Sequence, residues 1–308
     1  MRILVIGATG FIGRELVKEL ECSGHQVVAV SRNARKARAL LGSELEIVEW
    51  DGRTAVNLAI HLTGIDAIIN LAGENIASGR WTDRQKKLIS LSRVETGQLL
   101  SEAVKLSPDK PAALIQGSAI GFYGPHVEVP ADENQAGGTG FMAGLVKAWE
   151  SSIIQVQNII PRVVIIRTGL VLGNNGGLME KMLLPFKFYC GTVIGSGNQW
   201  MSWIHIRDEV RAIRFLLESN TSSGPYNLTS PNPVQMKTFI KSISITIKKP
   251  AWIRVPGMLL KTVLGEMAEE TILSSLDIIP GKLLHEGFKF EYPHLAPALN
   301  SLLLKENP

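Results

Sequence analysis

The chain begins with Arg2-Ile-Leu-Val-Ile6 followed by Gly7-Ala-Thr-Gly-Phe-Ile-Gly13, and this stretch decides the fold. The first five residues are mostly apolar and β-branched, which predicts a short buried parallel strand. Residues 14–20 have apolar side chains at helical spacing, so a helix is expected directly after the glycine-rich turn. Strand, glycine turn and helix in this order are the context that a dinucleotide-binding fingerprint requires.

Each glycine of the turn has an expected role. Gly7 would make the tight turn, Gly10 would let the backbone approach a pyrophosphate, and Gly13 would let helix and sheet pack closely. The helix N-terminus would offer unpaired N–H groups to the phosphates. The spacing G-x-x-G-x-x-G differs from the commoner G-x-G-x-x-G, and the alternative is a glycine turn without a ligand. The residues of this loop expected to contact a cofactor are Gly7, Thr9, Gly10, Phe11, Ile12 and Gly13.

Composition excludes several classes of protein. The 308 residues include 32 Lys and Arg and 28 Asp and Glu, and the basic residues are scattered along the sequence. This charge pattern does not indicate a nucleic-acid-binding protein. Cys22 and Cys190 build neither a disulfide framework nor a metal-type spacing. The first residues lead straight into a strand, and no apolar run is long enough to span a bilayer. We therefore expect a soluble cytoplasmic protein with no metal, membrane or nucleic-acid partner.

The first part of the chain alternates strands and helices. Two long helical regions are expected over residues 81–105 and 140–156, and these are faces that can pair in a homodimer. Further strands are expected over residues 26–30, 45–49, 67–71, 113–116 and 163–167. The predicted fold class is α/β, a Rossmann-type doubly wound parallel sheet.

The second part of the chain is less regular. Residues 125–140 are rich in Gly, Pro and acids, which predicts an excursion loop near the site. The alternation loosens after about residue 170. We predict a dinucleotide-binding domain over residues 1–170 and a smaller, mainly helical substrate lobe over 171–308, interleaved with the main sheet.

The end of the second predicted strand decides which dinucleotide binds. Ser31 and Arg32 stand there, with Arg35 close behind. An acidic residue would select NAD through the ribose 2′-hydroxyl, whereas a basic one can hold the 2′-phosphate of NADP. The residues therefore favour NADP(H) over NAD; the alternative is a set of solvated charges at a surface helix. Asp51, after the third strand, would either accept from the adenine amino group or cap the next helix.

Small residues follow the fourth predicted strand. Leu71, Ala72 and Gly73 would leave room for a cofactor to lie over the backbone. Glu74 is then an acid beside the expected nicotinamide, either as an acid/base group or as a structural hydrogen-bond acceptor. Arg93, in the long helix that follows, would face either solvent or the charged parts of the cofactor.

The glycine loop, the six-strand alternation and Tyr123-Gly124 after the fifth strand resemble the extended short-chain dehydrogenase/reductases, and most closely their epimerase/dehydratase branch. The match narrows to the atypical subgroup often labelled "epimerase family protein". Its motifs are Asn70-Leu-Ala-Gly-Glu74, Ser92-Arg93-x-x-Thr96, Arg167-Thr-Gly-Leu-Val-Leu-Gly173 and Trp203-Ile-His205. Residues 250–299 are similar to that subgroup's C-terminal segment of unassigned function. The resemblance implies NADP(H) held by Ser31-Arg32, by Leu71-Ala72 and by Arg93.

The wider family uses a tyrosine and a lysine one helical turn apart as an acid/base pair, with a serine that orients the substrate oxygen. No Tyr-x-x-x-Lys is present in the corresponding helix. Anchoring on Glu150 puts Met142 in the tyrosine position and Val146 in the lysine position, and neither side chain can transfer a proton. The serine position falls on Ala119, next to Ser118. Ordinary epimerase or dehydratase chemistry is therefore in doubt.

Other side chains are candidates for the proton transfer. They are Glu74, Tyr123 and His205, although Tyr123 usually has a structural part in the family and His205 can equally be a satisfied partner of Asp208 or of a backbone carbonyl. Ser118 and Gln199 are candidates for a polar substrate pocket. One hypothesis is an NADP(H)-dependent oxidoreductase or epimerase-like enzyme acting on a carbonyl metabolite or a sugar nucleotide. The other is a non-catalytic regulator or scaffold that senses NADPH.

Overall fold

The computed structural model describes residues 1–76, 79–174 and 176–304. Within them, seven parallel strands form the main sheet in the order β12-β7-β5-β4-β1-β2-β3. The strands are β1 (Arg2–Ile6), β2 (Gln26–Ser31), β3 (Glu46–Glu49), β4 (Ala67–Asn70), β5 (Ala113–Ala119), β7 (Arg162–Thr168) and β12 (Gly224–Leu228). The predicted doubly wound sheet is confirmed, and the strand order reverses between β1 and β4, where folds of this kind bind ligands.

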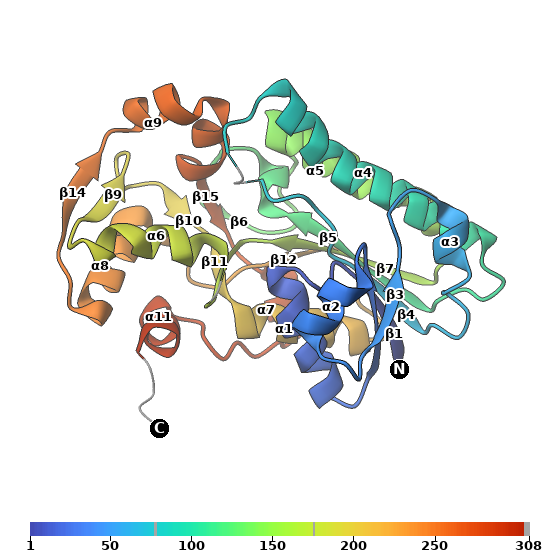
Figure 1. Cartoon of the computed structure of the whole chain (residues 1–308). Coiled ribbons are helices and arrows are strands. Elements are labelled where there is room, and N and C mark those ends of the chain that lie inside the picture. Colours follow the sequence, from blue (N-terminus) through green and yellow to red (C-terminus); the bar gives the residue numbers. More distant parts are fainter. Residues whose placement is uncertain (77–78, 175, 305–308) are drawn as a thin grey trace.

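Helices cover both faces of the sheet (Figure 1). One face carries α1 (Phe11–Cys22) and α7 (Ile206–Glu218), and the other carries α3 (Ala55–Ala59) and α4 (Asp83–Leu106). The strands are buried on both sides, which explains why they are nearly continuous apolar runs. The remaining helices of the first part are α2 (Ala34–Leu41) and α5 (Phe141–Ser151), the second of which packs beside α4.

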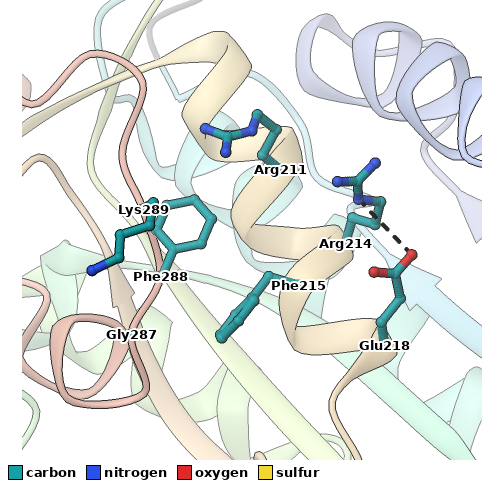
Figure 2. Close-up of a pocket in the computed structure, with 7 residues that line it drawn as sticks. All are labelled: Arg211, Arg214, Phe215, Glu218, Gly287, Phe288 and Lys289. Carbon is teal, nitrogen blue, oxygen red and sulfur yellow. Dashed lines mark ion pairs between the residues drawn. The ribbon is translucent and has the colours of Figure 1, made fainter.

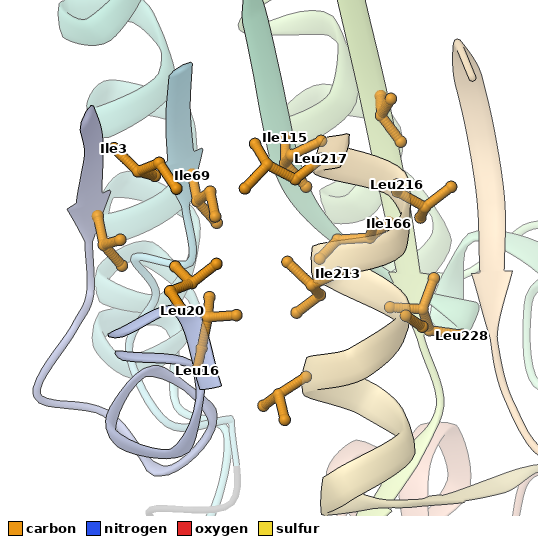
Figure 3. Close-up of a cluster of buried hydrophobic side chains, with 14 of the residues drawn as sticks. Ile3, Leu16, Leu20, Ile69, Ile115, Ile166, Ile213, Leu216, Leu217 and Leu228 are labelled. Atoms are coloured by element: carbon orange, nitrogen blue, oxygen red, sulfur yellow. The ribbon is translucent and has the colours of Figure 1, made fainter. Parts of the chain in front are cut away.

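The largest buried cluster joins α1 and α7 to the sheet. Leu16 and Leu20 of α1 and Ile213, Leu216 and Leu217 of α7 face apolar side chains of the strands (Figure 3). Each such buried aliphatic side chain contributes roughly 1.5–3 kcal/mol by leaving water. The cluster places the N-terminus of α1 firmly at the carboxyl edge of the sheet.

The later part of the chain forms a second group of elements, which lies beside the carboxyl edge of the sheet (Figure 1). Its strands pair in short two-stranded sheets: β8 (Leu170–Leu172) with β11 (Trp203–His205), β9 (Gly191–Ile194) with β14 (Ala251–Val255), and β10 (Trp200–Met201) with β13 (Val234–Gln235). Its helices are α6 (Gly177–Lys187), α8 (Met236–Ile247), α9 (Gly257–Leu264), α10 (Gly281–His285) and α11 (Leu295–Leu303). Since β12 belongs to the main sheet and α7 packs on one of its faces, the later part is interleaved with the first, while a domain boundary at residue 170 stays a prediction.

The loop expected over residues 125–140 is wrong in part. Residues His126–Ala131 form β6, which pairs in parallel with β15 (Ser275–Ile278). The partner strand lies almost 150 residues further along the chain, so no local pattern could indicate it. No helix within the described residues is long and apolar enough to cross a bilayer.

Among the buried carboxyl groups, that of Glu209 is only partly hydrogen-bonded. Glu209 in the first turn of α7 has no exposed surface, and its Oε1 accepts a hydrogen bond of 2.8 Å from Thr168 Oγ1 at the end of β7. Oε2 is buried without a hydrogen-bond partner. Burial raises the pKa of Glu209 from 4.5 to about 8, although the bond from Thr168 opposes the shift. The folded protein therefore keeps this group protonated at neutral pH.

The raised pKa makes stability depend on pH. The unfolded chain loses this proton near pH 4.5 and the folded chain only near pH 8, so the free energy of unfolding falls as pH rises between these values. We expect the Glu209→Gln variant to lack this contribution to the pH dependence. In that window its free energy of unfolding should therefore rise relative to that of the wild type, by up to about 1.4 kcal/mol for each pH unit. Urea unfolding at pH 5.5 and pH 8 measures it, with exposed Glu102→Gln as the control. Equal differences at the two pH values would contradict the assignment.

Candidate functional site

The glycine turn after β1 is packed so tightly that side chains cannot enter. Gly7 has a φ of +87°, and a Cβ placed on it would lie 2.8 Å from the carbonyl carbon of Leu71. A Cβ on Gly13 would lie 2.2 Å from the carbonyl oxygen of Gly7. The two packing roles expected for Gly7 and Gly13 are therefore confirmed: one makes the turn, and the other brings α1 against the strand.

The N-terminus of α1 is prepared for an anion. Its N-cap, Gly10, has no side chain to cap the first turn, and no acidic residue lies in that turn. The first N–H groups of a helix have no partner within the helix, so these remain available to a phosphate. Phe11 packs against a second glycine turn, because Cβ atoms on Gly173 and Gly176 would lie 2.8 Å and 2.7 Å from its ring.

Two cations stand where β2 ends. Arg32 and Arg35 are exposed, and no ion pair of either is found within the described residues. Asn33 caps α2 by accepting from the N–H of Lys36 at 2.8 Å, and no acidic residue lies in the first turn of that helix. Glu49 Oε2, at the end of β3, accepts from the N–H of Ala34 at 2.9 Å, so one carboxylate already lies at this helix N-terminus. The exposed guanidinium groups of Arg32 and Arg35 are suited to a phosphate, and their contact with the 2′-phosphate of NADP stays a prediction.

Asp51 accepts from the N–H of Arg53 at 2.9 Å in the turn before α3. The N-cap of α3 is Thr54, so the capping alternative for Asp51 is wrong. Its side chain is exposed at the end of the loop after β3, and contact with an adenine amino group stays a prediction. Ser31 contributes a local turn, since its Oγ accepts from the N–H of Asn33 at 3.2 Å.

The segment after β4 lies directly over the glycine turn. Leu71 and Ala72 contact Gly7. Gly73 lies against Arg93, because a Cβ placed on Gly73 would be 3.0 Å from the guanidinium carbon. Arg93 donates to the carbonyl of Ile89 at 3.2 Å and stacks on Trp149, 5.1 Å from the ring centre. Burial lowers the pKa of Arg93 to about 10, partly opposed by Glu74, so the side chain stays cationic at neutral pH.

Glu74 lies next to this cation. Its N–H donates to Ser92 Oγ at 3.0 Å, which fixes the backbone, while its carboxylate is exposed. Of the three predicted proton-transfer groups, Glu74 is the one whose side chain faces solvent.

Tyr123 and Ser118 belong to a buried polar network. Tyr123 donates to Asn227 Oδ1 at 2.7 Å and accepts from Arg167 Nη1 at 3.1 Å, while Ser118 donates to Glu150 Oε1 at 2.6 Å. Arg167 binds Glu150 through two hydrogen bonds of 2.9 Å and 3.0 Å. Burial raises the pKa of Tyr123, although the bond from Arg167 opposes the shift. These contacts account for both side chains, and their catalytic and substrate roles stay predictions.

His205 is buried at the N-terminus of α7. Its Nδ1 accepts from the N–H of Arg207 at 3.1 Å and caps α7, and Nε2 lies 3.2 Å from Ser301 Oγ. The ring packs on Tyr292 at 4.0 Å between centres. Burial lowers the pKa of His205 to about 4, so the ring is neutral at physiological pH. Both ring nitrogens have partners, which supports a structural role; a proton-transfer role stays a prediction.

Gln199 is the second predicted pocket residue. Its Nε2 donates to the carbonyl of Ile194 at 2.9 Å, and its Oε1 is buried without a hydrogen-bond partner. An unpartnered buried acceptor is costly in a folded protein, so a donor from a ligand would be favourable here.

The positions of the missing acid/base pair are filled by an apolar cluster. Met142 and Val146 of α5 are buried, and both would touch a Cβ placed on Gly121. Ala119 packs against the same cluster. Met267, Leu264 and Ile272 join it from the C-terminal segment. Lys147 points elsewhere, because its Nζ donates to the carbonyls of Gly138 at 2.6 Å and Gly137 at 3.2 Å.

One contact that shapes this region could not be predicted from the sequence. Glu270, in the one-turn helix Ala268–Ile272 (η3), accepts from the N–H groups of Phe141 and Met142 at 2.8 Å and 2.7 Å. It therefore caps α5 from about 130 residues away. No local signal in the sequence connects the two, since the cap is formed only by the folded chain.

Two hollows lie away from this region. One, of about 210 Å³, lies between α7 and residues 287–289 (Figure 2). Its Arg211 and Arg214 are paired with Asp208 and Glu19, so their charges are already balanced. The other, of about 660 Å³, lies at the amino edge of the sheet beside Met1, Asp66 and Arg162. No group of three His, Cys, Asp or Glu side chains suited to a metal occurs in the part of the chain that the structure describes.

Comparison with known families gives two matches. Residues 3–229 match the model of the NAD dependent epimerase/dehydratase family, and residues 255–302 match that of a domain of unknown function, DUF1731. The chain is 38% identical over 304 residues to epimerase family protein YfhF of Bacillus subtilis, covering 98% of each chain.

Solved structures are similar over nearly the whole chain. Human epimerase family protein SDR39U1, crystallised with NADPH, is 34% identical, with a TM-score of 0.87 and coverage of 98% of this chain and 99% of that one. A nucleoside-diphosphate sugar epimerase from Corynebacterium glutamicum is 27% identical, with a TM-score of 0.77 over 99% of this chain and 59% of that one.

The cap that Glu270 provides can be tested by its removal. We expect Glu270→Ala to lower the free energy of unfolding by about 1–2 kcal/mol, because two N–H groups of α5 lose their acceptor. The neighbouring Glu269→Ala is the matched control, since Glu269 makes an exposed ion pair with Lys261 and should cost about 0–0.5 kcal/mol. Urea unfolding of both variants gives the comparison, and equal losses would speak against a capping role.

Proposed function

This chain belongs to the NAD dependent epimerase/dehydratase family, and from that premise we propose that it is an NADP(H)-dependent oxidoreductase or epimerase-like enzyme with an unusual acid/base group. The observation that carries the proposal is the set of exposed cations at the end of β2, placed beside an uncapped α1 N-terminus. In this proposal Arg32, with Arg35 and Ser31, holds the 2′-phosphate, and the first N–H groups of α1 hold the pyrophosphate. The human relative crystallised with NADPH supports this choice of cofactor.

The nicotinamide, when bound, supplies or accepts a hydride. We place its ring near Gly73, where small residues leave the backbone open and Arg93 lies close by. Arg93 keeps its charge there and would orient an electronegative atom of the cofactor or of the substrate.

Glu74 is proposed to exchange the proton with the substrate oxygen. The side chains of Met142 and Val146 cannot transfer a proton. The hydroxyl of Tyr123 and both ring nitrogens of His205 are engaged in other hydrogen bonds. Within the described residues, the exposed carboxylate of Glu74 makes no such hydrogen bond, and it lies next to Arg93. The proposed substrate is a small carbonyl metabolite or a sugar nucleotide, and the relative named as a nucleoside-diphosphate sugar epimerase supports the latter.

A second function is favoured by the apolar cluster around Met142 and Val146. A protein that binds NADPH without turnover needs no acid/base pair, and the C-terminal segment fills that position with Met267. Such a protein would be a regulator or scaffold that responds to the cofactor. The two functions differ in one measurable property, the steady-state consumption of NADPH.

Removing the cation at the end of β2 tests the cofactor. Arg32→Ala should weaken NADPH binding by about tenfold or more, since a charged hydrogen bond contributes roughly 1.5–3 kcal/mol, and should leave NADH binding unchanged. Titrations followed by nicotinamide fluorescence measure both constants. Arg38→Ala, an exposed cation at the other end of α2, is the control. A loss that is equal for NADPH and NADH would remove the argument for the 2′-phosphate.

Removing the carboxylate tests the chemistry. With carbonyl compounds and sugar nucleotides as substrates, Glu74→Gln should lower kcat about a hundredfold or more, as expected for a general acid/base, and should preserve NADPH affinity. Glu95→Gln, which lies in α4 and is exposed, is the matched control. Unchanged kcat would exclude Glu74 as the proton donor. Tight NADPH binding with no consumption on any substrate would favour the regulatory function instead.

A further inference from the structure

The charge of this chain is unevenly divided. Residues 181–207 and 219–265 contain nine Lys and Arg residues and no Asp or Glu. Since the whole chain has 32 basic and 28 acidic residues, the rest of it is net acidic. Apart from the adjacent Lys248 and Lys249, these basic residues stand several positions apart in two separate stretches, so they look scattered in the sequence.

The fold gathers part of this charge at one end of the molecule, formed by α6, α8, β9 and β14 (Figure 1). We call it the cationic tip and define it by the residues Lys187, Phe188, Tyr189, Lys248, Lys249, Trp252 and Arg254. Trp252 Nε1 donates to the carbonyl of Tyr189 at 2.9 Å, and Lys249 Nζ lies 4.7 Å from the centre of the Tyr189 ring. Trp252 and Arg254 alternate along β14 and therefore share its exposed face.

Large apolar side chains of the tip face solvent. The exposed fractions are 72% for Phe188, 71% for Trp252 and 59% for Tyr189, and Ile245 at the end of α8 is 67% exposed. Single exposed apolar residues are ordinary, but neighbouring aromatic ones held in contact mark an interaction surface. Helix α9 also exposes large apolar side chains (Met258, Leu259 and Val263), but it carries a single basic residue and no aromatic one, whereas the tip combines aromatic side chains with several cations.

Two helices end at the tip, and each ends in a left-handed residue. Tyr189 and Lys248 have φ values of +58° and +54°, and they follow the last turns of α6 and α8. A left-handed residue is a common way to end a helix, and it turns the chain so that both residues belong to the exposed set.

We propose that the cationic tip binds the surface of an anionic lipid bilayer. Tryptophan and tyrosine favour the boundary between headgroups and acyl chains, and lysines beside them bind anionic headgroups. The surplus of positive charge is complementary to such a surface. The exposed aliphatic side chain of Ile245 favours lipid over nucleic acid, which would use aromatic faces and cations alone.

This attachment needs no bilayer-spanning segment. It revises the expectation that the protein has no membrane partner, which rested on the absence of a long apolar run. It is independent of the cofactor, because the tip shares no residue with the glycine turn, β2 or Arg93.

Vesicle sedimentation with the full chain tests the electrostatic part. At low ionic strength the protein should sediment with vesicles of phosphatidylcholine mixed with phosphatidylglycerol and not with phosphatidylcholine alone, and high salt should release it. The double variant Lys248→Glu/Lys249→Glu should weaken binding at least about tenfold, since each lysine near such a surface contributes about 1 kcal/mol. The double variant Lys18→Glu/Lys87→Glu, exposed elsewhere, should bind as the wild type does.

Quenching by brominated lipids tests the position of the aromatic side chains. All six tryptophans are described, and Trp252 is the exposed one, so its fluorescence should be quenched on binding. Trp252→Phe should bind vesicles and lose this quenching. Thermal unfolding confirms that each variant folds, as expected for exposed positions.

Three outcomes would overturn the proposal. One is the absence of binding to anionic vesicles at low salt, and another is binding that the tip variants leave unchanged. The third is tip-dependent binding of a single-stranded oligonucleotide, or tip-dependent self-association in gel filtration, without vesicle binding. Either result would give the tip a different occupant.

Discussion

The buried ion pair between Arg167 and Glu150 holds the carboxyl edge of this protein together. The guanidinium makes two hydrogen bonds to the carboxylate and lies 3.4 Å from the centre of the Phe122 ring. Although burial alone would lower the pKa of Arg167, the bonds and charge of Glu150 raise it, so the cation is stable there. Leaving either partner alone in this interior would be strongly unfavourable, which ties α5 to β7.

The same pair determines which side chains are available for chemistry. Ser118 donates to Glu150, and Tyr123 accepts from Arg167 and donates to Asn227. The polar side chains at the end of β5 and in the turn after it are thus committed to holding the sheet, this turn and β12 together. The apolar face of α5 covers the remaining space. The polarity near the proposed nicotinamide position then comes from the segment after β4 and from Arg93.

What the sequence predicts well is what neighbouring residues determine. The strand, the turn at Gly7 and the close packing at Gly13 depend on residues a few positions apart, and the structure confirms them. The pairing of β6 with β15 and the cap from Glu270 depend on segments more than a hundred residues apart, so no local pattern contains them. Asp51 illustrates an intermediate case, because a capping residue and a turn residue look alike until the helix start is known.

The C-terminal segment is part of the site rather than an appendage to it. Glu270 fixes the first turn of α5, and Met267 packs against the residues that replace the usual acid/base pair. A helix that carries a reactive tyrosine needs a water-accessible proton path, whereas a helix that carries Met142 and Val146 gains stability when an apolar segment covers it. The loss of the reactive pair and the presence of the covering segment therefore suit each other physically. The exposed carboxylate of Glu74, which we propose as the proton-transfer group, lies after β4, next to Arg93.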